Sequence, residues 1–417
     1  MCRRYMARRQ PLKTGGFTLS NVHPVVLIPV LNEEVRIHSC IENCRALAEV
    51  SPLTVIFATS CSERRVPGVD NTIDIIRRYQ KQYSWIKMYQ CPVPGVMAHQ
   101  LNHAIRAFQR EDDKPNNVLY ALYNVDSVIS VSALSWVCAR YASAQDRRVI
   151  YQQYGCYAKN WRNVAEQPWH LRGILRANML WQTRWSVGFE IPHALMGRSR
   201  GKVWMLNYCI GHGLFFNDEV YRLVGGFEEE TQNEDAMFGL QACLNNIAII
   251  PVPELELADS PDMVASLLRQ KTTWIYGPAQ AWTYRRLILK RRPNLRIADR
   301  IRLTVLSLQL FEHSLRWVIV PALMLLGLLL CFCAPWPVVA VYAVAATTYL
   351  GGLDILCASF LPGDLRPTVR DAFTVIYGAF IQFGMHGLSG LIGFVALLRA
   401  RWTGRRIVKG KTEMKQE

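Results

Sequence analysis

Short apolar runs alternate with amphipathic segments along the first third of the chain. The runs are rich in β-branched residues and bounded by polar clusters, so they predict buried parallel strands. These strands are expected at Pro24 to Val30, Leu53 to Thr59, Trp85 to Tyr89 and Val118 to Asn124. Helical patterns follow from Asn32 to Leu47, Asp70 to Tyr79 and Val96 to Phe108, the second capped by Asp70 or Asn71. The alternation predicts an α/β fold, with a Rossmann-like, mostly parallel sheet and flanking helices.

Polar residues stand where three of these strands end. Asn32, Thr59 and Asp126 follow the first, second and fourth runs. Ligands of doubly wound sheets bind beyond the carboxyl ends of the strands. The pattern therefore predicts one shared binding site at this edge.

Tryptophans and arginines are interspersed between residues 157 and 200, and the segment from Ala265 to Arg292 is similar. Helices rich in Trp and Arg prefer the membrane interface, so we expect amphipathic interface helices in both segments. The alternative for the first segment is an ordinary domain helix that packs its tryptophans on the sheet.

Three later segments are candidates for transmembrane helices: Trp317 to Ala334, Val338 to Leu353 and Ala372 to Leu398. Three crossings would place the basic tail (399–417) opposite a cytosolic domain, against the positive-inside tendency. We therefore expect a cytosolic C-terminus. It would be reached by a re-entrant final segment or by a further crossing that includes Ile301 to Phe311.

Composition fits a soluble domain joined to membrane spans. The 417-residue chain is 51% hydrophobic with a net charge of +16, and its mean hydropathy is +0.06. No nucleic-acid recognition motif accompanies the charge, which favours anionic lipid headgroups over nucleic acid as the partner. The twelve cysteines form no regular framework, so we expect reduced thiols. Met1 to Lys13 is basic without an apolar stretch, and we expect no signal peptide there.

The strongest chemical signal is a pair of acids, Glu234-Asp235, which follows Gly225-Gly226-Phe227 and precedes a helical pattern from Ala236 to Leu244. Adjacent carboxylates repel each other, so a site usually retains them for a task such as deprotonating a hydroxyl. The simpler interpretation is a pair of first-turn acids favoured by the helix dipole. Further along, Gln270 and Trp274 stand four residues apart, on one helix face.

These segments resemble membrane-bound family 2 glycosyltransferases, which carry a GGF…ED segment, a QxxRW segment and then transmembrane helices. The resemblance covers residues from about 22 to 280. It implies a GT-A fold and an inverting, metal-dependent transfer from a nucleotide-sugar, with a UDP-sugar as the expected donor, to a growing polysaccharide at the cell membrane. It also implies a multi-pass protein with a cytoplasmic catalytic domain. Two alternatives are a single-sugar transferase acting on a lipid-linked acceptor and a catalytically silent partner subunit.

The resemblance also assigns roles. Asp235 would be the general base, with Glu234 raising its pKa or capping the helix. Asn124-Val125-Asp126 is similar to the family's DxD motif, so Asp126 would bind Mg²⁺ or Mn²⁺. Donor binding is assigned to Pro29, Asn32, Glu33, Asn102, Asn124 and Asp126. Acceptor binding is assigned to Gly211, His212, Gly213, Gln270 and Trp274.

The chain departs from the family pattern at four places, and one is Asn124, which replaces the first Asp of DxD. Thr273 replaces the Arg of QxxRW, and Lys271 is a candidate to supply the missing charge. The second strand ends without the family's aspartate pair, and Val96-Met97 lacks its Lys, so recognition of uracil is in doubt.

The expected organisation has five parts: a basic N-terminal segment (1–21), a GT-A domain (22–260, with the interface helices at 157–200), QxxRW-like and interface helices (261–312), a transmembrane region (313–398) and the basic tail (399–417).

Overall fold

The computed structural model describes residues 2–6, 22–63, 71–199, 204–207 and 209–403. The chain divides into two compact units. The sheet unit comprises residues 1–154 and 190–256, and the helical unit comprises 155–189 and 257–417. Residues 155–189, which we placed in the 22–260 domain, thus group with the later helices. Of the two basic ends, α1 (Cys2–Met6) and the chain up to Thr403 are described, and the remainder of both lies outside the described residues.

A seven-stranded sheet forms the centre of the sheet unit, in the order β3-β2-β1-β4-β7-β5-β8. β7 is antiparallel to its neighbours, and the other pairs are parallel. The mostly parallel sheet predicted from the alternation is therefore confirmed. The strands are β1 (His23–Pro29), β2 (Thr54–Ser60), β3 (Ile86–Cys91), β4 (Val118–Leu122), β5 (Val149–Gln152), β7 (Leu214–Asn217) and β8 (Ala248–Pro251).

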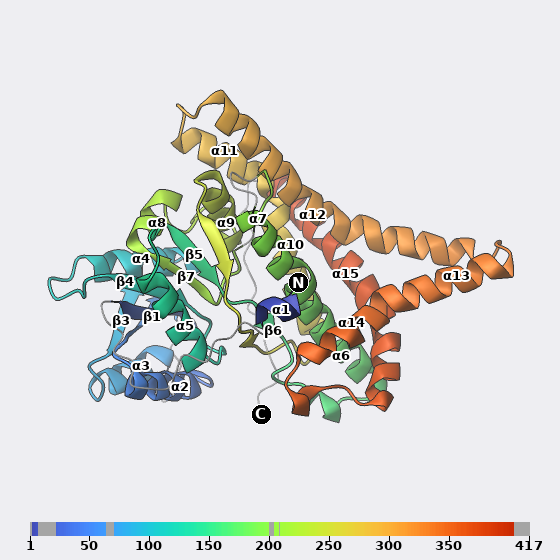
Figure 1. Ribbon diagram of the computed structural model, residues 1–417, viewed down its shortest axis with the longest axis horizontal. Helices are drawn as coiled ribbons and strands as arrows, with labels where there is room; N and C mark the ends of the chain where they lie inside the picture. The colour runs from blue at the N-terminus through green and yellow to red at the C-terminus, as the bar shows by residue number, and fades with distance from the viewer. Residues whose placement is uncertain (1, 7–21, 64–70, 200–203, 208, 404–417) are drawn as a thin grey trace. The chain divides into compact units, whose positions relative to one another are not determined.

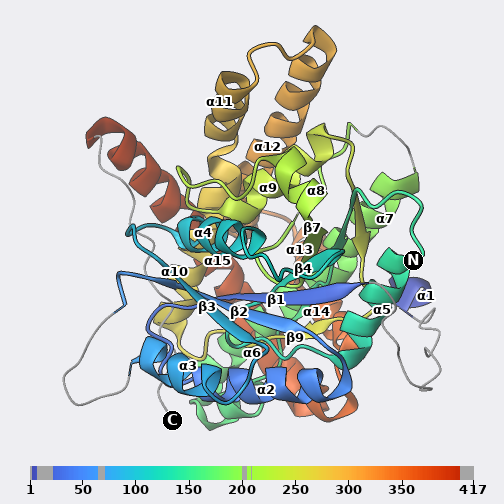
Figure 2. The same ribbon diagram turned by 90° about the vertical axis from the view of Figure 1, so that its left-hand side faces the viewer.

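Helices cover both faces of this sheet (Figure 2). One face packs against α2 (Ile37–Val50), α3 (Thr72–Gln80) and α5 (Val131–Ala142). The other packs against α4 (Met97–Gln109), α8 (Asp218–Val224) and α9 (Glu234–Leu244). The sheet unit also contains α7 (Ile191–Ser199) and Glu256, the first residue of β9 (Glu256–Leu257).

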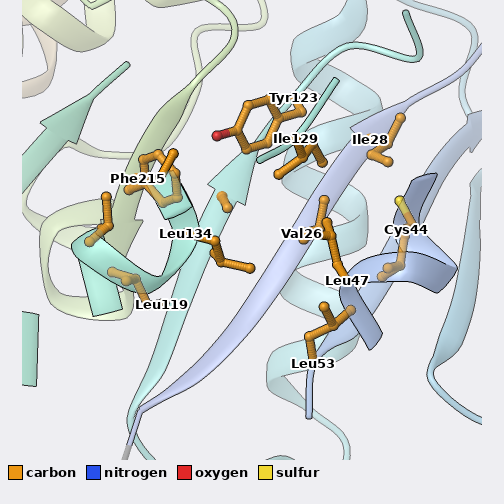
Figure 3. Packing of buried hydrophobic residues seen from close by; sticks show 14 of the residues in the cluster. Val26, Ile28, Cys44, Leu47, Leu53, Leu119, Tyr123, Ile129, Leu134 and Phe215 are labelled. Atoms are coloured by element: carbon orange, nitrogen blue, oxygen red, sulfur yellow. The ribbon is translucent and has the colours of Figure 1, made fainter. Parts of the chain in front are cut away.

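Alternate residues of β1 supply the two cores. Val26 and Ile28 pack with Cys44 and Leu47 of α2, as Figure 3 shows, whereas Leu27 belongs to the cluster on the opposite face. Because both faces of β1 are buried, its sequence is one continuous apolar run.

The first loop differs from the prediction. We expected a helix from Asn32, but α2 begins at Ile37. Asn32 adopts a φ of 52°, and its N–H donates to Glu63 Oε2 over 2.8 Å. A left-handed residue cannot continue a right-handed helix, so the chain turns here before α2 starts. At α3 the expected cap is Asn71, whose side chain accepts from the Asp74 N–H.

The helical unit is built from long helices joined by short 3₁₀ and π turns. Its main elements are β6 (Gly155–Cys156), α6 (Trp169–Trp185), α10 (Val264–Ala279), α11 (Ala281–Arg291), α12 (Ile297–Leu330), α13 (Trp336–Thr347), α14 (Leu353–Cys357) and α15 (Val369–Thr403).

Within the described residues, three helical segments are long and apolar enough to cross a membrane: Ile297–Leu330, Trp336–Phe360 and Val369–Thr403. They contain the second and third predicted spans, and the first predicted span (317–334) overruns the end of α12 at Leu330. α12 and α13 run side by side as a hairpin (Figure 1), where Gly327 lets the ring of Tyr342 approach closely. The 301–311 segment is the first part of α12, so it does not form a separate helix.

α6 differs from an amphipathic interface helix. Its residues from Gly173 to Thr183 are all buried, which makes it a central helix of its own unit. α15 packs directly on it, because a Cβ at Gly378 would lie only 2.1 Å from the Gly173 carbonyl carbon. Side chains on the covered faces are polar as well as apolar, and Gln382 Nε2 donates to Asn178 Oδ1 over 3.4 Å.

Candidate functional site

The ends of β1 and β4 are neighbours at the carboxyl edge of the sheet. Pro29 ends β1, and the loop after it runs through Asn32 and Glu33, where Glu33 N–H donates to Thr72 Oγ1 over 2.7 Å. Asp126 follows β4 and lies 3.9 Å from Arg36 Nη1, at the end of that same loop. The structure therefore brings the first loop and the DxD-like segment together, as the strand-end rule predicts.

Asp126 offers a single, partly exposed carboxylate at this edge. Its side chain is 26% exposed, and the N–H of Asn124 donates to Ser127 Oγ over 3.1 Å. Among the residues that the structure describes, no three His, Cys, Asp or Glu side chains form a group that could hold a metal ion. One carboxylate fits Mg²⁺ or Mn²⁺ only where substrate phosphates and water complete the shell, which is the usual situation for Mg²⁺ in phosphate chemistry.

The glycine loop 210–213 is held by two glutamines at the end of β5. Gln152 Nε2 donates to the His212 carbonyl (2.8 Å) and to the Gly213 carbonyl (3.2 Å), while its Oε1 accepts from Ile210 N–H (3.0 Å). Gln153 N–H donates to the Gly213 carbonyl over 2.7 Å. The loop leads directly into β7.

Gly213 must be glycine at its position. Its φ is 61°, and a Cβ there would lie 2.5 Å from the Gln153 carbonyl oxygen. The loop conformation is thus determined locally by β5 and by this glycine.

His212 pairs with a buried acid. Its Nδ1 lies 2.7 Å from Glu256 Oε2, and the two side chains are 13% and 1% exposed. Burial lowers the pKa of His212, but the Glu256 carboxylate, with Asp126 and Glu190, raises it to about 9. The imidazole is therefore positively charged at neutral pH.

Glu234 and Asp235 are the first two residues of α9, with Glu234 only 2% exposed. Asp235 Oδ1 accepts from the Ala236 N–H over 2.8 Å. Its Oδ2 lies 3.5 Å from where a Cβ on Gly211 would be, in ordinary van der Waals range. One oxygen thus serves the helix terminus, while the other faces the glycine loop.

Asn102 has a different role from the one we assigned. Its amide nitrogen donates to the Phe227 carbonyl (2.8 Å) and to Glu229 (2.7 Å), and its oxygen accepts from Phe227 N–H (3.0 Å) and Tyr221 O–H (2.7 Å). These four bonds use the full capacity of the buried amide. Asn102 therefore fixes the turn at Gly226 rather than contacting a donor.

The remaining candidates lie on α10 in the helical unit. Gln270 Oε1 accepts from Gln182 Nε2 over 3.0 Å, and Trp274 is partly exposed. Lys271 is fully buried, with Nζ 4.1 Å from the centre of the Trp181 ring. Burial lowers the pKa of Lys271 to about 7. This environment argues against Lys271 as the source of the charge that Thr273 lacks.

Comparison with protein families gives one match, over residues 183–350, to the family described as glycosyl transferase family group 2. Residues 183–350 of the chain thus match a family 2 glycosyltransferase model. The matched range includes the glycine loop, the Glu234-Asp235 pair and the α10 motif. No curated protein matches this glycosyltransferase.

Two solved structures are similar to the glycosyltransferase. One is the mannosyltransferase PcManGT from Pyrobaculum calidifontis with GDP-Man and Mn²⁺, at 15% identity and a TM-score of 0.46, covering 93% of this chain and 92% of that one. The other is glucosyl-3-phosphoglycerate synthase from Mycobacterium tuberculosis with Mn²⁺ and UDP-glucose. It has 14% identity and a TM-score of 0.34, covering 63% of this chain and 84% of that one.

Sequence reasoning missed three residues of the glycosyltransferase that shape this edge: Glu63, Gln152 and Glu256. Gln152 follows the strand-end rule, because β5 runs parallel to β4, but the short run of β5 was not recognised as a strand. Glu63 and Glu256 carry no sequence motif, and only the fold reveals their partners, Asn32 and His212.

Proposed function

We propose that this glycosyltransferase is inverting and metal-dependent, and that it transfers a sugar from a nucleotide-sugar to a growing polysaccharide at the membrane. The sheet unit would bind the donor at the ends of β1 and β4. Asp235 would take the proton from the acceptor hydroxyl as that oxygen attacks the sugar. We place the sheet unit in the cytosol, the transmembrane region (313–398) in the membrane of a multi-pass protein, and the C-terminus on the cytosolic side.

The observation that carries this proposal is the approach of Gly211 to Asp235. A general base must lie within hydrogen-bond reach of the hydroxyl that it deprotonates. The glycine leaves a carboxylate oxygen facing an open backbone loop, where any side chain would begin to fill the space. If Asp235 were only a first-turn acid of α9, this would explain why Oδ1 accepts from Ala236 N–H. It would not explain why Oδ2 faces Gly211.

Asp126 would hold Mg²⁺ or Mn²⁺ together with the donor diphosphate, and the bound ion would stabilise the negative charge of the departing nucleoside diphosphate. Asn32, Glu33 and Pro29 would position the nucleotide from the first loop. Arg36 Nη1 lies 3.9 Å from Asp126 Oδ2 at this sheet edge.

We propose the glycine loop as one acceptor-binding element and Gln270 and Trp274 of α10 as another. Trp274 would present a flat apolar ring to a sugar face. The same residues suit a single transfer to a lipid-linked acceptor, which the exposed apolar hairpin of α12 and α13 favours. The length of the product made by purified protein separates these two acceptors.

The direct test is a screen of UDP- and GDP-sugars with the full chain in detergent and Mn²⁺. We expect release of nucleoside diphosphate from one donor, loss of release with EDTA, and inversion of the anomeric configuration by NMR of the product. Failure to release nucleoside diphosphate from any donor, with glycan and lipid-linked acceptors supplied, would contradict the proposal and favour a silent partner subunit.

A further inference from the structure

Glu256 is a buried carboxylate, and within the described part of the chain it forms an ion pair with His212 but with no Lys or Arg. It begins β9, its N–H donates to the Tyr154 carbonyl (2.9 Å), and its Oε2 bonds His212 Nδ1. Burying a charged carboxylate costs several kcal/mol unless a partner compensates for it. A residue kept in such a place is expected to do something that an apolar side chain cannot.

Holding the loop backbone does not require Glu256. Gln152 and Gln153 already bond the carbonyls of His212 and Gly213, and Gly213 supplies the required φ. Glu256 contacts the imidazole itself. What it adds is therefore the orientation, the tautomer and the charge of that ring.

The two glycines that flank His212 connect it to both acids. A Cβ on Gly213 would lie 3.1 Å from Glu256 Oε2, and a Cβ on Gly211 would lie 3.5 Å from Asp235 Oδ2. The loop backbone on either side of His212 thus approaches the orienting carboxylate and the carboxylate that we assign as the base. The 13% exposed surface of its side chain is enough for contact with a ligand.

We propose that Glu256 is a positioning residue, which holds His212 so that its Nε2–H donates a hydrogen bond to an acceptor-sugar oxygen beside Asp235. This inference rests on the proposed transfer reaction. The carboxylate accepts from Nδ1–H and its negative charge stabilises the doubly protonated ring, in which Nε2–H is also a donor. A pKa of about 9 for His212 agrees with this arrangement.

The test is Glu256→Gln in the full chain, alone and combined with His212→Ala. A neutral glutamine oxygen still accepts from Nδ1–H, but the ring loses its second proton, so Nε2 becomes an acceptor. We expect kcat/KM for the acceptor to fall by about 10–100-fold, with the donor KM unchanged. Adding Glu256→Gln to His212→Ala should cause no further loss, because a positioning residue acts only through the ring.

The matched control is Glu254→Gln, two residues earlier, whose carboxylate accepts from the hydroxyls of Ser130 and Ser132. It should keep parental kcat/KM. Additive losses in the double variant, or unchanged kcat/KM in Glu256→Gln while the parent enzyme is active, would overturn the role of Glu256 and leave the proposed function standing. A parent that transfers no sugar would overturn both.

The second measurement needs no turnover. In ¹⁵N-histidine spectra at pH 7.5, the His212 signals should be those of the charged ring in the parent and of a neutral ring in Glu256→Gln. A neutral ring in the parent would also overturn the proposal.

Discussion

The two units differ in where their apolar side chains lie. In the sheet unit the apolar strands are inside, and residues such as Val26 and Leu27 have no exposed area. In the helical unit the α12–α13 hairpin turns its apolar side chains outward, with Leu329 55% and Phe332 84% exposed. A soluble surface rarely exposes such a large apolar patch. The contrast agrees with the finding that α12 and the α13 segment are long and apolar enough to cross a membrane.

The interior of the helical unit contains polar and charged side chains as well as apolar ones. Arg176 pairs with Asp371, Asn178 bonds Gln382, and Lys271 lies on the Trp181 ring. Polar groups inside a membrane unit are costly and pair with one another. α15 thus differs from the hairpin, because its polar side chains contact α6 and α10 while only part of its surface is apolar and exposed.

The largest expected change in this comparison is a loss of transfer activity, which tests whether the sheet unit holds the metal-binding site. Asp126→Ala should lower transfer by on the order of 10²-fold or more, because stabilisation of the leaving group by a metal is worth several kcal/mol. Activity that remains should no longer respond to Mn²⁺ titration. Asp299→Ala, which removes an acid of α12 that pairs with Arg296, is the control and should leave transfer unchanged. Unaltered Mn²⁺ dependence in Asp126→Ala would place the ion elsewhere.

The next effect concerns the stability of the sheet unit. Asn102→Ala removes the hydrogen-bond partner shared by the Phe227 backbone, the Tyr221 hydroxyl and Glu229. Each of these groups that stays buried and unsatisfied should lower the free energy of unfolding by about 1–3 kcal/mol. Thermal unfolding should begin several degrees lower. The control Asn116→Ala, on an exposed loop position, should leave the unfolding temperature unchanged. An unchanged transition in Asn102→Ala would show that the turn does not depend on this amide.

The smallest effect is a pH dependence in the helical unit. Burial lowers the pKa of Lys271 from 10.5 to about 7, so the unfolded chain binds this proton more tightly than the folded chain. Stability should therefore be lost as pH falls from about 10.5 towards 7, by at most about 1.4 kcal/mol per pH unit. Lys271→Met should flatten the slope of the unfolding temperature between pH 7 and 10. The control Lys290→Met, at an exposed position, should keep the parental slope. If Lys271→Met also kept the parental slope, other groups would cause the pH dependence.

Periodicity predicted the strands of the first half well, because a buried parallel strand needs an uninterrupted apolar run and β1, β2 and β4 have one. It failed at Asn32, where a hydrogen bond to Glu63 from another loop turns the chain. It could not place α6 either, since Trp and Arg occur both at interfaces and in the centre of a helical unit. Motif matching found Asp235 and His212 but not Glu256, whose role depends on a contact across 44 residues.

Asp235→Asn tests the central claim most directly, because the substitution keeps the shape and the oxygen that accepts from Ala236 but removes the base. We predict that transfer falls by on the order of 10²–10⁴-fold while donor affinity changes only a few-fold. Asp146→Asn, which alters an exposed acid paired with Arg148, is the matched control and should be as active as the parent. Near-parental transfer by Asp235→Asn would contradict the account, because the carboxylate facing the glycine loop would then not be the base.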